Sequence, residues 1–253
     1  MTSATNMAFA DHFSAVAAQY ANARPEYPSE LFDWIAGIAP ARGVVWEAGC
    51  GSGQASRDLA ERFARVFATD PSAAQVAQAM GPDNVVFSVE SSEHCSLPDA
   101  SADAVCVAQA LHWFDRDAFF AQCARVLKPA GVLVAWGYRD IEPPAHLSAS
   151  IDAFRADIDE YWPSERMFIV SGYAEFDWPF AAIDAPEFTM TVDWPLARML
   201  GYFSSFSAVK RYREVTGIDP IAVHAAAITS AWGDPETTQT LRWPFFVHAR
   251  RKG

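Results

Sequence analysis

The sequence predicts an α/β protein built on a mostly parallel sheet, and three observations carry this prediction. Val44, Val45 and Trp46 form a short apolar run, which is typical of a strand buried on both faces of a parallel sheet. A glycine-rich turn and an amphipathic pattern follow this run, and a second short strand then ends in Asp70. Strand, turn, helix and strand in this order form the unit that binds nucleotide-containing ligands in open sheets.

The turn after the first strand contains Gly49, Gly51 and Gly53 in a G-x-G-x-G spacing. Glycine adopts positive φ without strain and places no Cβ in the path of a ligand. Dinucleotide enzymes typically have G-x-G-x-x-G, in which a helix N-terminus faces a pyrophosphate. Glu47 lies just before this turn, where a carboxylate suits a cationic ligand better than a phosphate. S-adenosylmethionine, which carries a sulfonium and an ammonium, meets this requirement.

A helix and a second strand follow the turn. Leu59, Phe63 and Val66 recur at helical spacing, so we expect one helix whose apolar face includes all three and packs on the sheet. Asp70 closes the second strand about 20 residues after the glycines, where a carboxylate can accept both hydroxyls of a ribose. The sequence therefore predicts an adenosine-containing ligand, and a nicotinamide cofactor is the alternative to S-adenosylmethionine.

The run E-A-G-C-G-S-G that starts at Glu47, together with Asp70, resembles motif I and the ribose-binding acid of class I S-adenosylmethionine-dependent methyltransferases. Later segments agree with that family in order: a third strand and loop over 85–97, a fourth strand over 104–114, and a Lys-Pro-x-Gly turn and fifth strand within 125–138. The resemblance implies a Rossmann-like sheet, mostly parallel with an antiparallel last strand and a helical cap. It also implies a cofactor-binding core over 34–140.

The same resemblance implies which residues contact S-adenosylmethionine. Ser92 and Glu93 match the pair beside the adenine, although the first is usually Ala or Asp in the family. Gln109 and Ala110 follow the fourth strand and contact the cofactor through their backbone. The full expected set is Tyr20, Arg24, Glu47, Gly49, Cys50, Gly51, Gly53, Asp70, Pro71, Ser92, Glu93, Gln109 and Ala110.

Three further stretches, 12–35, 108–115 and 201–220, look like the trans-aconitate methyltransferase-like subgroup of type 11 domains. This narrower resemblance implies that residues 1–33 form an N-terminal lid, in which Tyr20 and Arg24 reach toward the methionine end of the cofactor. The alternative is that Arg24-Pro25 and Tyr27-Pro28 only fix an extended linker, because proline restricts the residue before it.

The remainder of the chain is expected to belong to the same domain, which spans 1–253. Cap insertions are predicted over 141–235 around a strand near 187–192, with helical pieces broken at Gly217 and at Asp219-Pro220. The last strand is predicted over 240–249, where Pro244 favours an edge or a bulge.

Ligands of such sheets bind outside the carboxyl ends of the strands, which makes Trp113, Trp136 and Tyr138 candidate substrate contacts. His112 is the candidate general base, because the pKa of histidine lies near neutral pH. The alternative is that His112 belongs to a packing corner. We expect a small-molecule acceptor, first a carboxylate oxygen, which needs no base. Methylation at carbon, nitrogen or hydroxyl is the second choice, and a cofactor-binding protein without catalysis is the third.

Composition excludes several other classes. The net charge of −12, from 31 acidic and 19 basic residues, would repel a phosphate backbone, so we expect neither DNA nor RNA as substrate. The sequence has no apolar window of about 18 residues and no basic and apolar leader, so we expect no membrane association and a cytoplasmic location. The cysteines and histidines show no metal-binding spacing, so no metal is expected. The sequence does not determine the oligomeric state.

Overall fold

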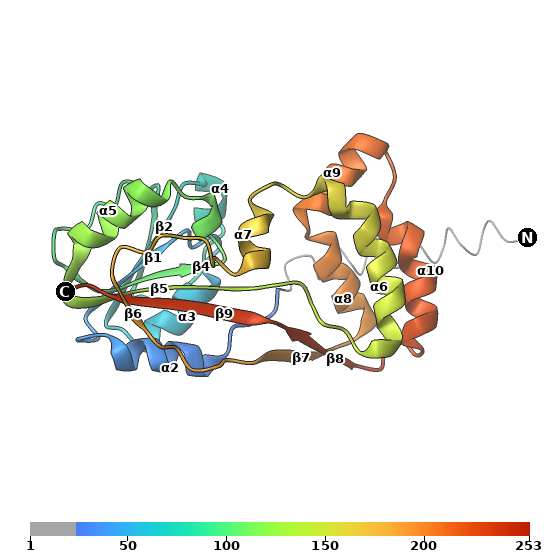
Figure 1. The fold of residues 1–253 in the computed structure, drawn as a ribbon, viewed down its shortest axis with the longest axis horizontal. Coiled ribbons are helices and arrows are strands. Elements are labelled where there is room, and N and C mark those ends of the chain that lie inside the picture. The colour runs from blue at the N-terminus through green and yellow to red at the C-terminus, as the bar shows by residue number, and fades with distance from the viewer. Residues whose placement is uncertain (1–23) are drawn as a thin grey trace, which may run out of the picture. The chain divides into compact units, whose positions relative to one another are not determined.

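The computed structural model describes residues 24–253, which divide into two compact units (Figure 1). The sheet unit comprises Glu26–Arg139, Met167–Thr189 and Phe245–Gly253. The helical unit comprises Asp140–Arg166 and Met190–Pro244, together with residues 24 and 25. Tyr20 and most of the expected lid lie outside the described residues.

The frame of the sheet unit is a sheet with the strand order β3-β2-β1-β4-β5-β9-β6 (Figure 1). Strands β1 to β5 pair in parallel, and β9 pairs antiparallel with both β5 and β6. The predicted fold class, a mostly parallel sheet with an antiparallel last strand, is confirmed. The strand bounds are β1 Val44–Ala48, β2 Arg65–Asp70, β3 Val85–Val89, β4 Ala102–Ala108, β5 Leu127–Tyr138, β6 Ala181–Ile183 and β9 Phe245–Arg251.

Helices cover both faces of this sheet (Figure 1). Successive residues of a strand point to opposite faces, so Val45 packs in the core with α2 and α3, while Trp46 packs in the second core with α5. Both cores are apolar and buried, as expected for a parallel sheet covered on two sides. The helix bounds are α2 Ser29–Ile38, α3 Gln54–Ala60, α4 Ala73–Val76, α5 Arg116–Val126 and α7 Arg166–Ser171, with a single 3-10 turn, η1, at Leu111–Trp113.

The helix expected to include Leu59, Phe63 and Val66 is shorter than predicted. It ends at Ala60, and Val66 lies in β2 opposite Val45. The N–H of Phe63 still donates to the carbonyl of Leu59, at 2.9 Å, and its ring stays buried in the same core. The apolar spacing therefore runs through a turn into a strand, because the chain must leave the helix early to begin β2 parallel to β1.

The late strands are divided differently from the prediction. The segment 240–249 forms two strands, β8 (Gln239–Trp243) and β9, separated at Pro244, which has no N–H to donate to a ladder. The strand expected near 187–192 is β7 (Met190–Trp194), and it pairs with β8 in a separate two-stranded sheet. The strand beside β9 in the large sheet is instead β6, a three-residue strand that the sequence analysis did not anticipate.

The helical unit contains most of the late helices (Figure 1). The chain turns between α9 and α10 at Gly217, which has φ of 70°, and Asp219 caps α10 by accepting the N–H of Ile221. The bounds are α6 Ala145–Ile158, the 3-10 turn η2 Asp159–Tyr161, α8 Leu196–Ser204, α9 Ser207–Thr216 and α10 Pro220–Trp232. Within residues 24–253, none of the helices combines the length and apolarity needed to cross a bilayer.

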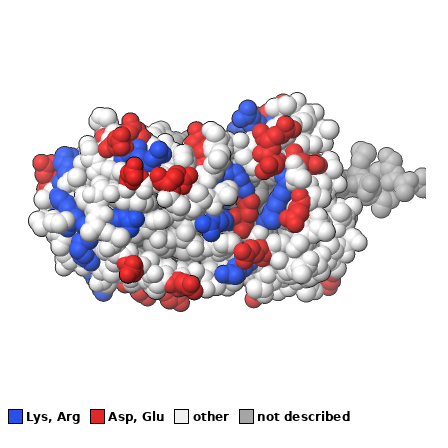
Figure 2. All heavy atoms as spheres, viewed as in Figure 1, with Lys and Arg blue, Asp and Glu red and all other residues white. Residues whose placement is uncertain are grey.

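Charged side chains of both signs intermingle on the face of the molecule shown in Figure 2. The excess of acidic residues in the sequence, 31 against 19, therefore does not gather into one continuous acidic region on that face.

A buried carboxylate joins three strands at the amino edge of the sheet. Asp103, at the start of β4, is fully buried and accepts the backbone N–H groups of Gly43 and Val44, both at 2.9 Å. Its other oxygen accepts Nζ of Lys128, from β5, at 2.7 Å. A buried carboxylate needs such partners, and through them Asp103 links the beginning of β4 to the beginnings of β1 and β5.

Replacing Asp103 by alanine is expected to destabilise the protein by about 2–4 kcal/mol, because two N–H groups and a lysine lose their acceptor. Asp103→Asn keeps an acceptor oxygen and should cost less. The matched control is Asp99→Ala, since Asp99 is 80% exposed and its ion pair with Arg125 is worth about 0.5 kcal/mol or less. Urea unfolding followed by tryptophan fluorescence measures these differences, and equal losses for Asp103→Ala and Asp99→Ala would contradict the role of Asp103.

Candidate functional site

The glycine turn between β1 and α3 adopts a left-handed conformation at each of its glycines. The φ angles are 71° at Gly49, 55° at Gly51 and 85° at Gly53, a region that other residues rarely occupy. The N–H groups of Gly49 and Cys50 donate to the carbonyl of Thr69 in β2, at 2.8 and 3.0 Å. The turn is therefore fixed to the end of the neighbouring strand.

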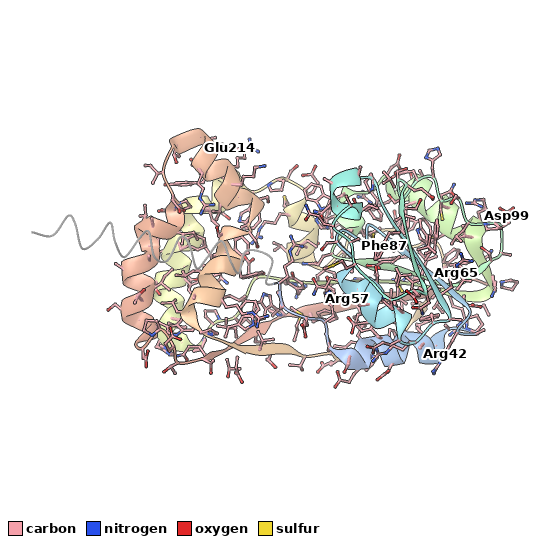
Figure 3. All side chains as sticks on the ribbon, turned by 180° about the vertical axis from the view of Figure 1, so that it is seen from behind. Arg42, Arg57, Arg65, Phe87, Asp99 and Glu214 are labelled. Atoms are coloured by element: carbon pink, nitrogen blue, oxygen red, sulfur yellow. The ribbon has the colours of Figure 1, made fainter. Side chains whose placement is uncertain are left out.

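The three glycines have different surroundings. A Cβ at Gly49 would lie 2.7 Å from the Cβ of Ala110, and one at Gly53 would lie 2.8 Å from the ring of Phe87 on β3, which Figure 3 labels. A Cβ at Gly51 would meet no atom within 4 Å. Two glycines therefore allow close packing, and the third presents its backbone to open space, as a turn that receives a ligand must.

Asp70 lies at the end of β2 and holds the same turn. Its carboxylate accepts the N–H groups of Gly51 and Ser72, both at 2.9 Å, and the side chain is partly exposed. An ionised carboxylate has about four acceptor positions, so two further hydrogen bonds can form. The expected ribose contact is therefore chemically open, and Asp70 has a second task that the sequence did not indicate. The neighbouring Pro71 is exposed.

Glu47, in β1, is 1% exposed and accepts a very short hydrogen bond from the hydroxyl of Ser56 on α3. Burial raises the pKa of Glu47 to about 8, with smaller contributions in the same direction from Asp58 and Asp70, while the bond from Ser56 lowers it. At neutral pH this carboxyl therefore carries a proton. A cation placed beside it would favour the ionised form.

Cys50 lies within the turn and is also buried. Burial raises the pKa of its thiol well above the usual range, and the charges of Glu47 and Asp70 raise it further. The side chain is therefore a neutral thiol, which is a weak nucleophile and a weak donor. Its expected contact with the cofactor would be through the backbone of the turn.

Ser92 and Glu93 lie in the loop after β3. The hydroxyl of Ser92 donates to Oε1 of Glu93 at 2.7 Å, and the N–H of Asp115, the residue that caps α5, donates to the same oxygen at 3.2 Å. Burial alone would raise the pKa of Glu93, but these hydrogen bonds, with one from Ser91, outweigh burial and lower it. Glu93 is therefore an oriented carboxylate.

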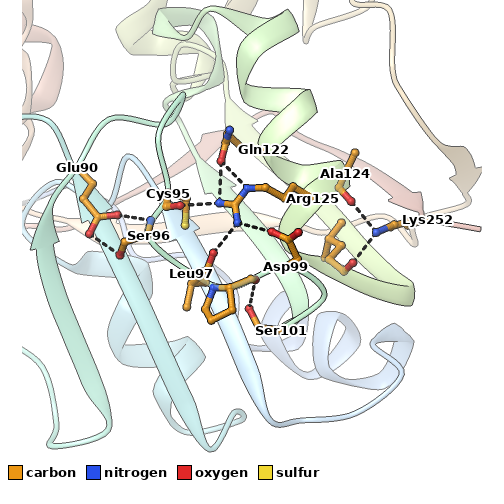
Figure 4. A network of polar contacts seen from close by, with 12 residues as sticks. Glu90, Cys95, Ser96, Leu97, Asp99, Ser101, Gln122, Ala124, Arg125 and Lys252 are labelled. Atoms are coloured by element: carbon orange, nitrogen blue, oxygen red, sulfur yellow. Dashed lines mark hydrogen bonds and ion pairs between the residues drawn. The ribbon is translucent and has the colours of Figure 1, made fainter.

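Arg125 of α5 fixes the other end of this loop (Figure 4). Its guanidinium donates to the carbonyls of Cys95, at 2.5 Å, and Leu97, at 2.7 Å, and to the side chains of Asp99 and Gln122. Sequence analysis missed this residue, because a single arginine in a helix gives no sign of the distant loop that it binds. Arg125 and Asp115 together determine where the Ser92–Glu93 pair lies.

Gln109 and Ala110 follow β4. Gln109 has φ of 53°, and its side-chain amide donates to the carbonyl of Tyr138 at 3.1 Å and accepts the N–H of Tyr138 at 3.2 Å. This two-sided pairing links the carboxyl ends of β4 and β5, so the side chain of Gln109 is structural. Ala110 lies against Gly49, which brings this segment to the glycine turn.

His112, in η1, forms a hydrogen bond between Nδ1 and the hydroxyl of Tyr173 at 3.0 Å. Tyr173 is fully buried and has φ of 61°. Sequence analysis gave Tyr173 no role, since it lies 61 residues from His112 in a segment without regular periodicity. Trp113 is 57% exposed, and its ring lies 4.8 Å from that of His112, so its surface is open to a ligand as the predicted substrate contact requires.

Trp136 is not placed where the predicted substrate contact requires. It is fully buried in the core beside α2, with its ring edge-on to Tyr27 at 5.7 Å and to Phe32 at 5.8 Å. The alternation of side chains along β5 directs it to that face. Tyr138, two residues later, is 7% exposed and lies 6.3 Å from Tyr27. Trp136 is therefore corrected to a core residue.

Several of the described site residues of the sheet unit meet at the glycine turn. Asp70 and Thr69 bind the glycine turn, Ala110 packs on it, and Glu47 lies in the strand that leads into it. Arg24 belongs to the helical unit and is exposed, so its expected contact stays a prediction. Among residues 24–253, no group of three or more His, Cys, Asp or Glu is arranged to hold a metal.

The pH dependence of stability should report the raised pKa of Glu47. Its folded-state pKa of about 8 exceeds the ordinary value of 4.5, so the stability that this group contributes is complete below pH 4.5 and is lost as the pH rises to 8. Between these limits the loss is roughly 1.4 kcal/mol per pH unit. Glu47→Gln should remove this loss, which urea unfolding of both proteins from pH 5 to 8 would measure. Parallel stability curves would show that Glu47 is not protonated in the folded protein.

Residues 46–135 match the model of a methyltransferase domain. A Dictyostelium discoideum protein named as a methyltransferase is 31% identical over 204 residues, which cover 79% of this chain and 78% of that protein. An uncharacterized methyltransferase of Mycobacterium tuberculosis is 38% identical over 131 residues, 51% of this chain and 53% of its own length. The chain therefore spans about half the length of the mycobacterial relative.

A solved structure is similar to this chain in both sequence and fold. A type II methyltransferase from Anaeromyxobacter dehalogenans has a TM-score of 0.84 and 41% identity, with 90% of this chain and 97% of that chain covered. The narrower resemblance to the trans-aconitate methyltransferase-like subgroup is not confirmed by these relatives. The family does decide between the two cofactors considered above. The Dictyostelium protein is 31% identical to this chain, and the match covers 78% of its length. We therefore conclude that the chain belongs to the S-adenosylmethionine-dependent methyltransferases of class I.

Proposed function

We propose that this methyltransferase transfers a methyl group from S-adenosylmethionine to a carboxylate oxygen of a small molecule. One observation supports the donor half of this proposal: the glycine turn, open at Gly51, is bound by Asp70 and lies beside the buried carboxyl of Glu47. These residues fit a ligand that has a ribose at one end and positive charge at the other. When bound, S-adenosylmethionine supplies a methyl group that its sulfonium activates toward nucleophiles.

Each residue of the donor site has a proposed task. Asp70 accepts the ribose hydroxyls with the acceptor positions that Gly51 and Ser72 leave open. Glu47 ionises when the cationic end of the ligand lies beside it and then provides negative charge there, and the backbone of the turn lies along the ligand. Ser92 and Glu93, held by Asp115 and Arg125, lie beside the adenine. Tyr20, Arg24 and Pro71 remain proposed contacts of the same ligand.

The acceptor is proposed to be a carboxylate because methyl transfer is a displacement that depends mainly on alignment in a dry site. A carboxylate is ionised at neutral pH and needs no base, whereas an alcohol, amine or carbon acid requires removal of a proton. The resemblance to the trans-aconitate methyltransferase-like subgroup supports the same choice. Trp113 and Tyr138 are proposed to contact the acceptor.

We also infer the setting in which the protein acts. The net charge of −12 argues against a nucleic-acid substrate. A small, anionic acceptor would be a metabolite of the cytoplasm, and no metal would be required for its methylation.

The proposed acceptor class is tested by incubating the protein with S-adenosylmethionine labelled in the methyl group and a panel of small carboxylic acids. We expect release of S-adenosylhomocysteine and a product whose label is freed as methanol by mild alkali, as for a methyl ester. A product with alkali-stable label would instead show methylation at carbon, nitrogen or an ether oxygen. Matched alcohols and amines serve as the control panel.

Asp70→Ala is expected to weaken binding of S-adenosylmethionine by about 1.5–3 kcal/mol, or roughly 10- to 150-fold, because a charged acceptor is lost. Asp70→Asn keeps one oxygen and should bind with intermediate affinity. Asp83→Ala, which removes an exposed acid from the same unit, is the control. Calorimetric titration measures the three affinities, and unchanged affinity of Asp70→Ala would remove Asp70 from the site.

A further inference from the structure

The hydrogen bond between His112 and Tyr173 determines which nitrogen of the imidazole carries the proton. Tyr173 is fully buried, and its hydroxyl lies 3.0 Å from Nδ1 of His112. Burial raises the pKa of this phenol well above the usual range, so the hydroxyl keeps its proton at any pH of interest. Either group could in principle donate, since a neutral imidazole has one N–H and one acceptor nitrogen.

The surroundings of the phenol oxygen decide the direction. Among residues 24–253, Nδ1 of His112 is the hydrogen-bond partner of this hydroxyl, and the tyrosine is fully buried. A buried O–H without an acceptor is costly, so the phenol must donate to this nitrogen. Its own O–H is then directed to Nδ1, and a neutral His112 carries its proton on Nε2.

The backbone conformation and the neighbouring aromatic rings fix the position of Tyr173. Its φ of 61° follows a φ of 66° at Gly172, and a left-handed tyrosine persists only where its surroundings fix it. The ring stacks on Phe176 at 4.8 Å and meets the edge of Phe246 at 5.0 Å. The carbonyl of Gly172 accepts Nε2 of His248 at 2.7 Å. The phenol is therefore a rigid partner for the imidazole.

We propose that Tyr173 is a positioning residue that holds His112 as the Nε2–H tautomer, so that His112 donates a hydrogen bond to an acceptor oxygen and does not remove a proton. This inference rests on the proposed function and deepens it. A general base needs a ring lone pair, but the lone pair of Nδ1 is taken by the phenol, and Nε2 bears the proton. The acceptor must then be a nucleophile from which His112 need not remove a proton, and carboxylates, which are ionised at neutral pH, are such a class.

The tautomer can be measured without any substrate. Protein labelled with ¹⁵N-histidine is examined by long-range ¹H–¹⁵N correlation at a pH where His112 is neutral, with its signals assigned by their loss in His112→Gln. We expect Nε2 to show the shift of a protonated nitrogen and Nδ1 that of an unprotonated one. In Tyr173→Phe the preference for the Nε2–H tautomer should weaken, while Tyr212→Phe, which alters a tyrosine of the helical unit, should leave that preference unchanged. A proton on Nδ1 in the wild-type protein would overturn the proposal, whether or not Tyr173→Phe folds.

Activity with an acceptor from the carboxylate panel provides the second readout. His112→Gln keeps an N–H donor but cannot act as a base, so it should retain at least tenfold more activity than His112→Ala. A general base would make both variants equally poor, with losses of about 10² to 10⁴. If none of the acceptors is methylated, the proposed function fails, while the nitrogen shifts still decide the tautomer.

Discussion

The hydrogen bond from the N–H of Gly51 to Asp70, at 2.9 Å, is the contact on which the geometry of the donor site depends. It fastens the glycine turn to the end of β2, beside the bonds that Thr69 accepts from the same turn. The turn begins where the strand order reverses between β1 and β4, the place at which open sheets bind ligands. Because Asp70 holds the turn and retains acceptor positions, the residue that shapes the site is also the one proposed to bind ribose.

Two acidic groups near this turn, Glu47 and Asp58, are costly to ionise. Glu47 and Asp58 both have a raised pKa, chiefly because of burial, and Asp70 adds to the effect on Glu47. Such repulsion is unfavourable in the isolated protein, as is common where charge is arranged for a ligand. Under the proposed function, a sulfonium and an ammonium would offset it, so the same charges that weaken the fold above pH 4.5 would favour the cofactor.

The parts of the protein that could be predicted from sequence depend on short-range patterns. The glycine spacing predicts the positive φ angles that the structure has at Gly49, Gly51 and Gly53. Apolar runs such as 44–46 predict the parallel sheet. The end of α3 was misjudged because Val66 continues a helical spacing while lying in a strand. Strand β6 is too short to show alternation, and Trp136 could not be told from a surface aromatic until the face of β5 was known.

The acceptor side could not be predicted, because its chemistry depends on a contact between residues far apart in the chain. His112 alone indicates a base, since its ordinary pKa is near neutral pH. The position of Tyr173, fixed by a left-handed backbone and by stacked rings, supports the proposal that Nδ1 is already an acceptor. An imidazole held in this way orients an oxygen instead of deprotonating it. Methylation of a carboxylate needs that orientation and no proton transfer, so the donor site and the residues after β4 support the same reaction for different physical reasons.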